Sequence, residues 1–482
     1  PPAMGFYASE AVRPFLARDR VRFVGEPVAV VVAETAYQAA DAAEAVWADV
    51  APLTAVVSLD DAVAAETVLF EARDDNVMWQ IPSAGAIDFS GCEVVVTEEL
   101  WISRVAAVSI EPRVVAASFA DGKLTYWASS QGTHDFRDGA AKCLGMEPSE
   151  VRVLVKDIGG GFGAKGMVSE EEVIVGQLSR LVGRPVRWVE SRTENLSAFV
   201  HGRAQAQTVT IGGTRDGRVT HYRLDVVQDC GAYPKWGAFL PEFTRQLASG
   251  VYDIANLEFS AVSVATNTAP TCAYRGAGRP EATAAVERAM DLFAAEIGMD
   301  SAEVRRTNLL ASEAFPYTTP TGTSMDSGDY EGSLDRALAA ADYAGLRAEQ
   351  QRRRAAGDPV HMGIGVATYV EITGFGGSEY GEVRLRDDGT VLASTGATPI
   401  GTGHHTTWAM IVADRLGVPL DSIEVFHGDT EVIPSGSTTG GSRSVQIAGS
   451  AMADASEKLV DLARQAAADL LEAAPGDVVL DR

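Results

Sequence analysis

The sequence lacks any cysteine pair that could hold a metal or an iron–sulfur cluster. Its four cysteines lie far apart and form no Cys-x-x-Cys motif: Cys92, Cys143, Cys230 and Cys272. This spacing argues against a locally built cluster and favours reduced thiols in a cytoplasmic protein. No apolar run is long enough to cross a bilayer and no signal-peptide pattern opens the sequence, so we expect no membrane segment.

Positive charge is also scarce, since 40 Lys and Arg face 66 Asp and Glu and give a net charge of −26. Such a balance argues against nucleic acid or an anionic membrane as a partner. A chain of 482 residues with 46% apolar residues exceeds one ordinary domain and can bury a large core. Because it starts at Pro1 and stops within the strand-like residues 476–482, we expect it to be part of a larger polypeptide or assembly.

A glycine-rich loop at residues 158–166 stands between a predicted strand and a predicted helix. The valine-rich residues 151–156 alternate as a strand does, and Ser169 opens a helical run with three glutamates in its first turn, where acids suit the helix dipole. Glycine permits positive φ and close backbone approach, so this loop can direct its amides at a ligand. Lys165 is followed by Gly166 and not by Ser or Thr, which excludes a phosphate-binding P-loop. By itself the loop is either a plain turn or part of a binding site.

Two further loops stand before predicted helices. Gln131 lies in residues 129–134, where a predicted strand gives way to a helix, and it is either a ligand contact or a solvated loop residue. Arg275 and Arg279 lie among small residues at 273–281, directly before another predicted helix. Two arginines in that position suit an anion or a polar substrate, or they hold carbonyl groups of their own loop.

The last third of the chain contains two loops rich in glycine, serine and threonine, each followed by a predicted helix. They are residues 401–407 and residues 435–444, and the second precedes a long helix that ends near Ala474. Such loops offer the unpaired N–H donors that pyrophosphate binding requires, although each could instead be a flexible linker. The adjacent His404 and His405 would point in different directions without a carboxylate pair, which argues against a metal site.

Other segments predict the remaining architecture. Residues 21–57 form a β-α-β pattern, with a buried strand at 27–32 and an alanine-rich helix at 34–47. Residues 60–88 show no clear period and are interpreted as a connecting segment. The charged residues 347–358 predict a linker between two domains.

Five segments together resemble one protein family, in that family's order along the chain: residues 129–132, 159–165, 273–281, 401–407 and 441–444. It is the molybdenum-binding large subunit of the xanthine oxidase family of molybdenum hydroxylases, which includes aldehyde oxidoreductases, carbon monoxide dehydrogenase and bacterial N-heterocycle hydroxylases. The resemblance implies an α+β fold. A partial α/β hammerhead domain at residues 1–75 would precede two elongated molybdopterin-binding α+β domains at residues 76–335 and 345–482.

The same resemblance implies a molybdenum–molybdopterin cofactor, as the cytosine dinucleotide in bacteria, between the two elongated domains. Gln131 resembles the glutamine that hydrogen-bonds the apical ligand of molybdenum. Phe162 and Gly163 resemble the pair whose backbone approaches the metal centre, and Arg275 resembles the arginine of the substrate loop. The catalytic assignment is therefore Gln131, Phe162 and Arg275, without a protein ligand to the metal. All three, with Gly163, would also contact the cofactor, and the further cofactor contacts implied are Gly161, Gly401, Thr402, Gly403, His404, Thr406, Thr407, Gly441, Ser442, Arg443 and Ser444.

The implied chemistry is hydroxylation of an aldehyde or an aromatic N-heterocycle with water as the oxygen source, where the cofactor carries the hard step. Because this chain has no cysteine motif for iron–sulfur centres, the resemblance implies a small [2Fe-2S] subunit and a medium FAD subunit as partners. The family's catalytic glutamate lies beyond Arg482, on a companion chain or a further C-terminal region. The similar pairs Gly25-Glu26 and Gly381-Glu382 fall in the wrong region for it.

The sequence departs from particular members of the family at three positions. Gly276 stands where carbon monoxide dehydrogenases carry a copper-binding cysteine, so carbon monoxide oxidation is disfavoured. Gly166 stands where xanthine enzymes have a substrate-binding glutamate. Thr402 replaces a frequent glutamine of the cofactor loop.

Three alternatives to a hydroxylase subunit stay open at this point. A non-catalytic molybdopterin-binding or assembly protein would keep the loops and lack the glutamate. A large-subunit homologue of carbon monoxide dehydrogenase would lack the copper-binding cysteine. A dinucleotide-fold oxidoreductase is disfavoured, because no G-x-G-x-x-G with a downstream ribose-binding acid lies in a β-α-β unit.

Overall fold

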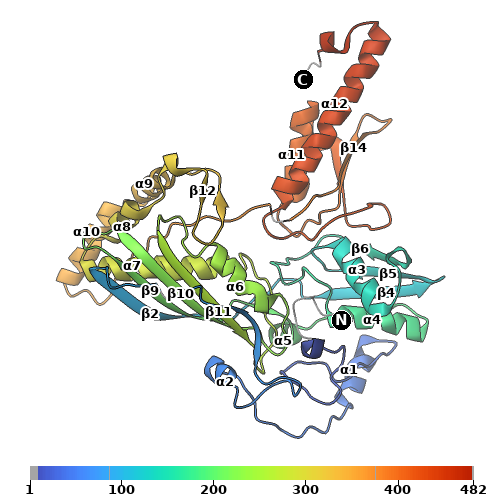
Figure 1. The fold of residues 1–482 in the computed structure, drawn as a ribbon. Helices are drawn as coiled ribbons and strands as arrows, with labels where there is room; N and C mark the ends of the chain where they lie inside the picture. Colours follow the sequence, from blue (N-terminus) through green and yellow to red (C-terminus); the bar gives the residue numbers. More distant parts are fainter. Residues whose placement is uncertain (1–8, 86, 375, 480–482) are drawn as a thin grey trace. The chain divides into compact units, whose positions relative to one another are not determined.

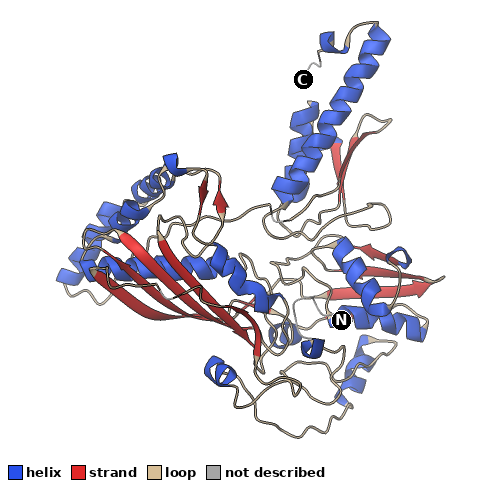
Figure 2. Cartoon of the chain, viewed as in Figure 1, coloured by secondary structure: helices blue, strands red, loops and turns tan. Residues whose placement is uncertain are grey.

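The computed structural model describes residues 9–85, 87–374 and 376–479. The chain forms two compact units and crosses between them. The first unit holds the residues up to Thr54, Ala106–His201 and the residues from Ile372 onward, whereas the second holds Ala55–Val105 and Gly202–Glu371. Each unit combines helices with sheets (Figures 1 and 2), so the predicted α+β class is confirmed. The limits of the three predicted sequence domains stay a prediction.

A four-stranded sheet forms the centre of one half of the first unit. Its strand order is β6-β5-β4-β7, with β5 and β6 parallel and the other neighbours antiparallel. Helix α3 contacts β6 and helix α4 contacts β4 and β7, and the rings of Tyr126 and Phe136 meet edge to face in the core between them. These elements are β4 Val114–Ala120, β5 Lys123–Ala128, α3 Thr133–Leu144, β6 Val151–Leu154, α4 Glu170–Val182, β7 Val186–Val189 and α5 Arg192–Ser197.

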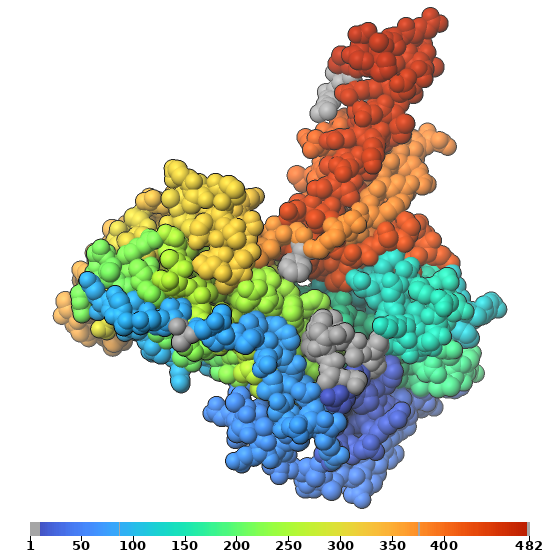
Figure 3. Space-filling model, viewed as in Figure 1, coloured from blue at the N-terminus to red at the C-terminus, as the bar shows by residue number. Residues whose placement is uncertain are grey.

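A three-stranded sheet with two helices forms the other half of the first unit. Strands β14 and β15 form an antiparallel hairpin, and β16 lies parallel to β15. Trp408 is fully buried in the core beneath the helices, and its Nε1 donates to the carbonyl of Ser444 at 3.0 Å. The elements are β14 Gly381–Leu385, β15 Val391–Thr395, α11 His404–Leu416, β16 Ile423–Phe426, a π-helix Ser444–Gly449 and α12 Ser450–Leu471. The residues of α12 lie within the red part of the surface in Figure 3.

Backbone hydrogen bonds join these two halves at the edge strand β6. The amide of Val155 donates to the carbonyl of Gly428 at 2.8 Å, and the amide of Thr430 donates to the carbonyl of Val153 at 3.2 Å. The guanidinium of Arg152 binds both carboxylate oxygens of Asp429, at 3.1 and 2.6 Å. The segment after β16 therefore completes the sheet edge that carries the glycine-rich loop.

The second unit is built on a five-stranded sheet in the order β1-β11-β10-β9-β2. Strands β10 and β11 are parallel and the remaining neighbours are antiparallel. Side chains of the sheet and of the long helix α7 share one buried apolar core. The sheet and its main helices are β1 Val77–Ile81, β2 Val94–Ile102, β9 Gln205–Gly213, β10 Val219–Asp229, α6 Trp236–Gln246, β11 Asn256–Val264, α7 Arg279–Ile297 and α8 Ser301–Asn308.

Short elements complete the described chain. They are α1 Ala36–Glu44, α2 Leu59–Ala64, α9 Tyr330–Ala340, α10 Tyr343–Ala355, the two-residue strands β3 Val105–Ala106, β8 His201–Gly202, β12 Tyr317–Thr318 and β13 Ser324–Met325, and 3₁₀ turns at Ser9–Ala11, Pro148–Glu150, Ser312–Ala314, Leu420–Ser422 and Pro475–Asp477. No helix among the described residues combines the length and the apolar character needed to cross a membrane.

The predicted strand at residues 27–32 is wrong. The helix of the same β-α-β pattern forms as α1, but residues 27–32 run as irregular chain, and Val28, Val30 and Val32 are each more than 40% exposed. A strand needs a neighbouring strand to satisfy its backbone groups, and no strand among the described residues pairs with this segment, whose Pro27 carbonyl accepts only a single bond from the amide of Ala17. Alternation of valines alone could not supply that neighbour.

Two segments predicted as irregular contain regular structure. The predicted linker 347–358 lies mostly in α10, because Asp342 caps its first turn and Glu349 pairs with Arg352 and Arg353 one turn on. The predicted connecting segment 60–88 contains most of α2 and all of β1. At the end of the chain, Pro475–Asp477 forms a 3₁₀ turn, and residues 480–482 of the predicted strand lie outside the described residues.

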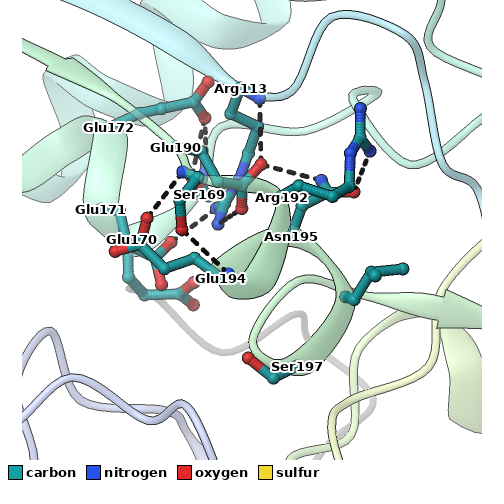
Figure 4. Close-up of polar contacts among 12 residues, drawn as sticks. Arg113, Ser169, Glu170, Glu171, Glu172, Glu190, Arg192, Glu194, Asn195 and Ser197 are labelled. Atoms are coloured by element: carbon teal, nitrogen blue, oxygen red, sulfur yellow. Dashed lines mark hydrogen bonds and ion pairs between the residues drawn. The ribbon is translucent and has the colours of Figure 1, made fainter.

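A buried ion-pair network surrounds the acidic start of α4 (Figure 4). Arg113 donates to Glu171 at 2.7 Å and to Glu190 at 3.0 and 2.5 Å. Arg13 donates to Glu170 at 3.0 Å and to Glu171 at 2.7 Å. Burial alone would lower the pKa of Arg113, but Glu171 and Glu190 raise it above its ordinary value. The predicted dipole effect of the three glutamates is thus only part of their role, because two of them also bind arginines that come from far along the chain.

Removing Arg113 should destabilise the first unit strongly, because it would leave the buried carboxylate of Glu190 without a cation among the described residues and would take from Glu171 one of its cations, the other being Arg13. We expect Arg113→Met to lower the free energy of unfolding by about 3–5 kcal/mol. The matched control is Arg184→Met, whose exposed pair with Glu34 should contribute less than about 1 kcal/mol. Urea unfolding followed by tryptophan fluorescence measures both, and equal stability of the two variants would contradict a structural role for the network.

Candidate functional site

The buried side chain of Gln131 joins three segments of the first unit. Its Oε1 accepts hydrogen bonds from the amides of Gly163 at 2.9 Å and Lys165 at 3.2 Å, and its Nε2 donates to the carbonyl of Thr439 at 2.7 Å. The backbone of Gln131 binds the same two segments: its amide donates to the carbonyl of Lys165 at 3.0 Å, and its carbonyl accepts from the amide of Thr439 at 2.8 Å. One Nε2 hydrogen has no acceptor among the described residues. The structure therefore brings Gln131 to the glycine-rich loop.

The glycine-rich loop turns sharply around this glutamine. Gly160, Phe162 and Gly163 have φ values of +100°, +57° and +101°, and for phenylalanine this is a strained conformation. A Cβ on Gly161 would lie 2.5 Å from Oε1 of Gln131, so only glycine fits there. The amides of Gly160, Gly161 and Phe162 donate to no described residue, whereas the amides of Gly159 and residues 163–166 are all used. The loop thus presents three successive unused donors.

An ion pair between the buried Lys165 and the partly exposed Glu111 supports the loop. Nζ of Lys165 donates to the carbonyl of Glu111 at 2.7 Å, to its Oε2 at 3.2 Å and to Oγ of Ser129 at 2.7 Å. Oε2 of Glu111 also accepts from the amide of Gly159 and from Ser129, both at 2.8 Å. Burial lowers the pKa of Lys165, whereas the amide of Gly159 and the hydroxyl of Ser129 outweigh burial and lower the pKa of Glu111. Lys165 is therefore occupied inside the protein and is not a ligand-binding cation.

The loop at 401–407 ends in the first turn of α11, which begins at His404, four residues before the predicted helix start. Gly401 and Gly403 have φ values of +87° and +77°, and Oγ1 of Thr402 contacts the His404 ring at 3.1 Å. No side chain caps the helix, and the amides of His404, His405 and Thr406 donate to no described residue. Burial lowers the pKa of His404. The first turn of α11 thus has free amides and no acidic side chain, and this arrangement suits an anion.

The loop at 441–444 leads into a π-helix, a feature frequently found at functional sites. Gly441 and Ser442 have φ values of +63° and +54°, and the amides from Gly440 to Ser444 donate to no described residue. Arg443 is buried. Its Nη2 donates to the carbonyl of Ser378 at 2.9 Å and lies 3.7 Å from Glu379, while its Nε has no partner among the described residues.

These loops fit an oxygen-rich, anionic cofactor such as molybdopterin with its phosphates. Gln131 offers one amide hydrogen, the glycine-rich loop three backbone donors, and the two later loops further donors at helix starts. All three loops belong to the first unit. Among the described residues, no group of three or more His, Cys, Asp or Glu could hold a metal ion directly. A metal in this site would therefore be carried by a cofactor.

The predicted substrate loop belongs to the second unit. Arg279 is buried, pairs with Glu371 at 2.7 Å and donates to the carbonyl of Ala277 at 3.1 Å. Arg275 is exposed, and its guanidinium has no hydrogen-bond or ion-pair partner among the described residues. The contact of Arg279 with Ala277 agrees with the loop-holding interpretation, whereas ligand binding by Arg275 stays a prediction. Arg279 holds the loop and Arg275 is available to a ligand.

Comparison with known proteins identifies the cofactor. Family models for molybdopterin cofactor-binding domains match residues 69–309 and 336–482. The chain is 36% identical to the large chain of carbon monoxide dehydrogenase from Hydrogenophaga pseudoflava, over 96% of this chain and 62% of that protein. It is 34% identical to the gamma subunit of the 6-hydroxypseudooxynicotine dehydrogenase complex from Paenarthrobacter nicotinovorans, over 97% of this chain and 60% of that protein.

A solved structure gives the same result for the fold. Quinoline 2-oxidoreductase from Pseudomonas putida 86 matches with a TM-score of 0.92 at 30% identity, over 98% of this chain and 62% of that one. Fold and loops define a molybdopterin-binding protein. The chain belongs to the xanthine oxidase family of molybdenum hydroxylases, as a molybdopterin-binding large subunit. It spans 60–62% of the length of the two curated relatives.

Sequence reasoning found the loops and missed what holds them. Lys165 was considered only as a P-loop lysine, and neither Glu111 nor Thr439 was singled out. Glu111 stands alone in the sequence without a motif, and its partners lie 18 to 54 residues away. Thr439 acts through its backbone, which leaves no sequence signal. The one available signal was the position of Lys165 directly after the glycines.

Removing the lysine should loosen the glycine-rich loop. Lys165→Met would leave Glu111 without its buried cation, so we expect a loss of about 2–3 kcal/mol in unfolding free energy. We also expect faster amide hydrogen exchange in residues 159–166. Lys142→Met, which alters an exposed lysine on α3, is the control. Unchanged exchange in the loop of the Lys165 variant would contradict this account.

The first unit should lose stability in mild acid through His427. Burial lowers the pKa of this histidine to about 4, and the adjacent His405 ring acts in the same direction. As pH falls from about 6.5 to 4, the unfolded chain takes up the proton before the folded chain does, so the folded state loses stability across that window, by about 1–3 kcal/mol.

Unfolding free energies of wild type and His427→Phe, measured between pH 7 and 4, test this point. The variant should show the shallower decline, while His361→Phe, at an exposed histidine, should follow the wild type. Parallel curves for wild type and His427→Phe would rule the effect out.

Proposed function

We propose that this chain is the molybdenum-cofactor subunit of a multi-subunit hydroxylase that oxidises an aromatic N-heterocycle or an aldehyde, with water as the oxygen source. The observation that carries the proposal is the convergence of the glycine-rich loop and the 438–439 segment on the buried Gln131, in a chain of the molybdopterin-binding family. The cofactor, which we infer to be the cytosine dinucleotide form, supplies the two-electron redox centre when bound.

The chain's own residues would bind and orient this cofactor. The second Nε2 hydrogen of Gln131 and the amides of residues 160–162 are donors for oxygen ligands at the metal end. The free amides at the start of α11 and at residues 440–444 are donors for the phosphates of the dinucleotide. Phe162, at positive φ and 36% exposed, places its backbone at the tightest point of the loop. In this proposal Gln131 and Phe162 act at the reacting centre.

Arg275 would orient the substrate. Its unpaired guanidinium can donate to a ring nitrogen or a carbonyl oxygen through fixed N–H directions. The relative that acts on quinoline favours an aromatic N-heterocycle as the substrate class. Carbon monoxide is disfavoured although a carbon monoxide dehydrogenase is similar, because Gly276 offers no thiolate for copper.

Partner subunits complete the proposed enzyme. The similar proteins are a large chain and a gamma subunit, which supports a multi-subunit assembly. We infer a small [2Fe-2S] subunit and a medium FAD subunit as the electron route. The catalytic glutamate would lie on a companion chain or in a further C-terminal region, and we infer a cytoplasmic complex without nucleic-acid or membrane partners.

A second candidate is a non-catalytic molybdopterin-binding or assembly protein. The observation in its favour is that both matching family models describe cofactor-binding domains, a match that such a protein would also give. The free side chain of Arg275 favours the enzyme, because a non-catalytic binding or assembly protein needs the cofactor loops but no arginine that binds a substrate.

Replacing Gln131 tests the proposed function. We expect Gln131→Ala in the purified complex to lower kcat by about 10–100-fold, since residues around a metal ligand shell commonly contribute that much, while the molybdenum content per chain stays near the wild-type value. Gln465→Ala, at an exposed glutamine on α12, is the matched control. Full activity of the Gln131 variant would remove this residue from the reacting centre.

A further inference from the structure

The turn that carries Arg275 has an unusual backbone. Gly276, Ala277 and Gly278 have φ values of +99°, +41° and +87°, so three successive residues lie in the left-handed region. This conformation is strained for alanine and persists only when the surroundings enforce it. Hydrogen bonds inside the turn, from Ala277 N to Tyr274 O at 2.7 Å and from Arg279 N to Gly276 O at 3.3 Å, do not reach the Arg275 peptide group.

Arg203 supplies the missing contacts from the start of the neighbouring strand. Its Nη2 donates to the carbonyl of Arg275 at 2.5 Å, and its Nη1 donates to the carbonyl of Tyr274 at 3.3 Å. The same Nη1 binds the carboxylate of Glu281 at 3.1 Å, and the guanidinium lies 4.9 Å from the centre of the Tyr274 ring. One side chain thus holds two successive carbonyls of the turn and the first turn of α7.

Arg203 is itself fixed in place. Arg203 and Ala204 have φ values of +65° and +70°, a second strained corner directly before β9. The end of β10 secures this corner, because Nε2 of Gln228 donates to Arg203 O at 2.9 Å and the amide of Asp229 donates to Ala204 O at 3.0 Å. The guanidinium therefore projects from the rigid sheet of the second unit.

The carboxylate of Glu281 keeps the Arg203 guanidinium in this position. Glu281 is fully buried, and its Oε1 has no hydrogen-bond partner among the described residues. Arg203 is the one cation paired with it among those residues. A buried carboxylate with a single cation holds that cation strongly, because its charge would otherwise be left in a low-dielectric interior.

We propose that Arg203 is a positioning residue that fixes the Arg275 peptide and so directs the Arg275 side chain toward the substrate. The role in substrate handling rests on the proposed function, whereas the hold on the turn does not. Arg203 binds the main-chain carbonyl of Arg275, while the Arg275 side chain is exposed and has no partner among the described residues. Arginine is required because its planar fork serves two carbonyls and a carboxylate at once, and a lysine ammonium has neither that reach nor that geometry.

The variant Arg203→Lys separates positioning from folding. It keeps a cation for Glu281 and gives up the fork, so we expect the complex to assemble with wild-type molybdenum and pterin content. Amide exchange should rise within residues 274–279, and KM should rise on the order of 10–100-fold with a smaller change in kcat. Arg223→Gln, at a half-exposed arginine of β10, is the control and should change neither. A second variant, Arg203→Gln, removes the cation as well as the fork. If it fails to fold, the exchange and kinetic measurements on Arg203→Lys still test the proposal.

A double-mutant cycle with quinoline and a simple aromatic aldehyde as probe substrates completes the test. If Arg203 acts through Arg275, the double variant Arg203→Lys/Arg275→Ala should be no worse than Arg275→Ala alone. Additive losses, or wild-type exchange in residues 274–279 of Arg203→Lys, would overturn the proposal. A third outcome is raised amide exchange in residues 274–279 of Arg203→Lys with wild-type kinetics in both single variants. It would mean that Arg203 fixes the turn but that Arg275 has no role in substrate binding.

Discussion

The first unit depends on one buried amide side chain that serves three segments at once. Gln131 is 1% exposed. Its oxygen binds the glycine-rich loop and its nitrogen binds Thr439, which lies 308 residues further along the chain. A buried polar group is costly unless it is hydrogen-bonded, so these bonds are strongly selected in the folded state. The result is a loop whose strained Phe162 and unused amides stay in one arrangement before any cofactor arrives.

Charged side chains near the candidate loops also hold the protein's own structure in place. The net charge of the chain is −26, yet three cations of the candidate loops are engaged within the protein. Lys165 is bound by Glu111, Arg443 lies beside Glu379, and Arg279 is paired with Glu371. Backbone amides are left to face an anionic ligand, and Arg275 is the exception, with a free guanidinium on a turn held by Arg203. Uncharged backbone amides that are held in fixed positions select a ligand by its shape as well as by its charge.

The sequence predicted the loops and most of the regular structure because both leave local signals. Ser169 with the glutamates at the start of α4 and the glycines at 159–163 are recognisable without any distant partner. The strand at 27–32 could not be judged in that way, because a strand exists only with a neighbour. The α10 helix was missed because a cap and ion pairs, not an apolar stripe, stabilise it. Arg203 and Glu111 act at long range on backbone atoms, which no motif records.

The central claim is that these loops hold a molybdenum–molybdopterin cofactor. The most direct measurement is the molybdenum and pterin content of the intact complex that contains this chain, by mass spectrometry of the metal and fluorescence of the oxidised pterin. We expect about one molybdenum and one pterin per chain. A properly folded complex, isolated from cells supplied with molybdate, that carries neither molybdenum nor pterin would contradict the claim.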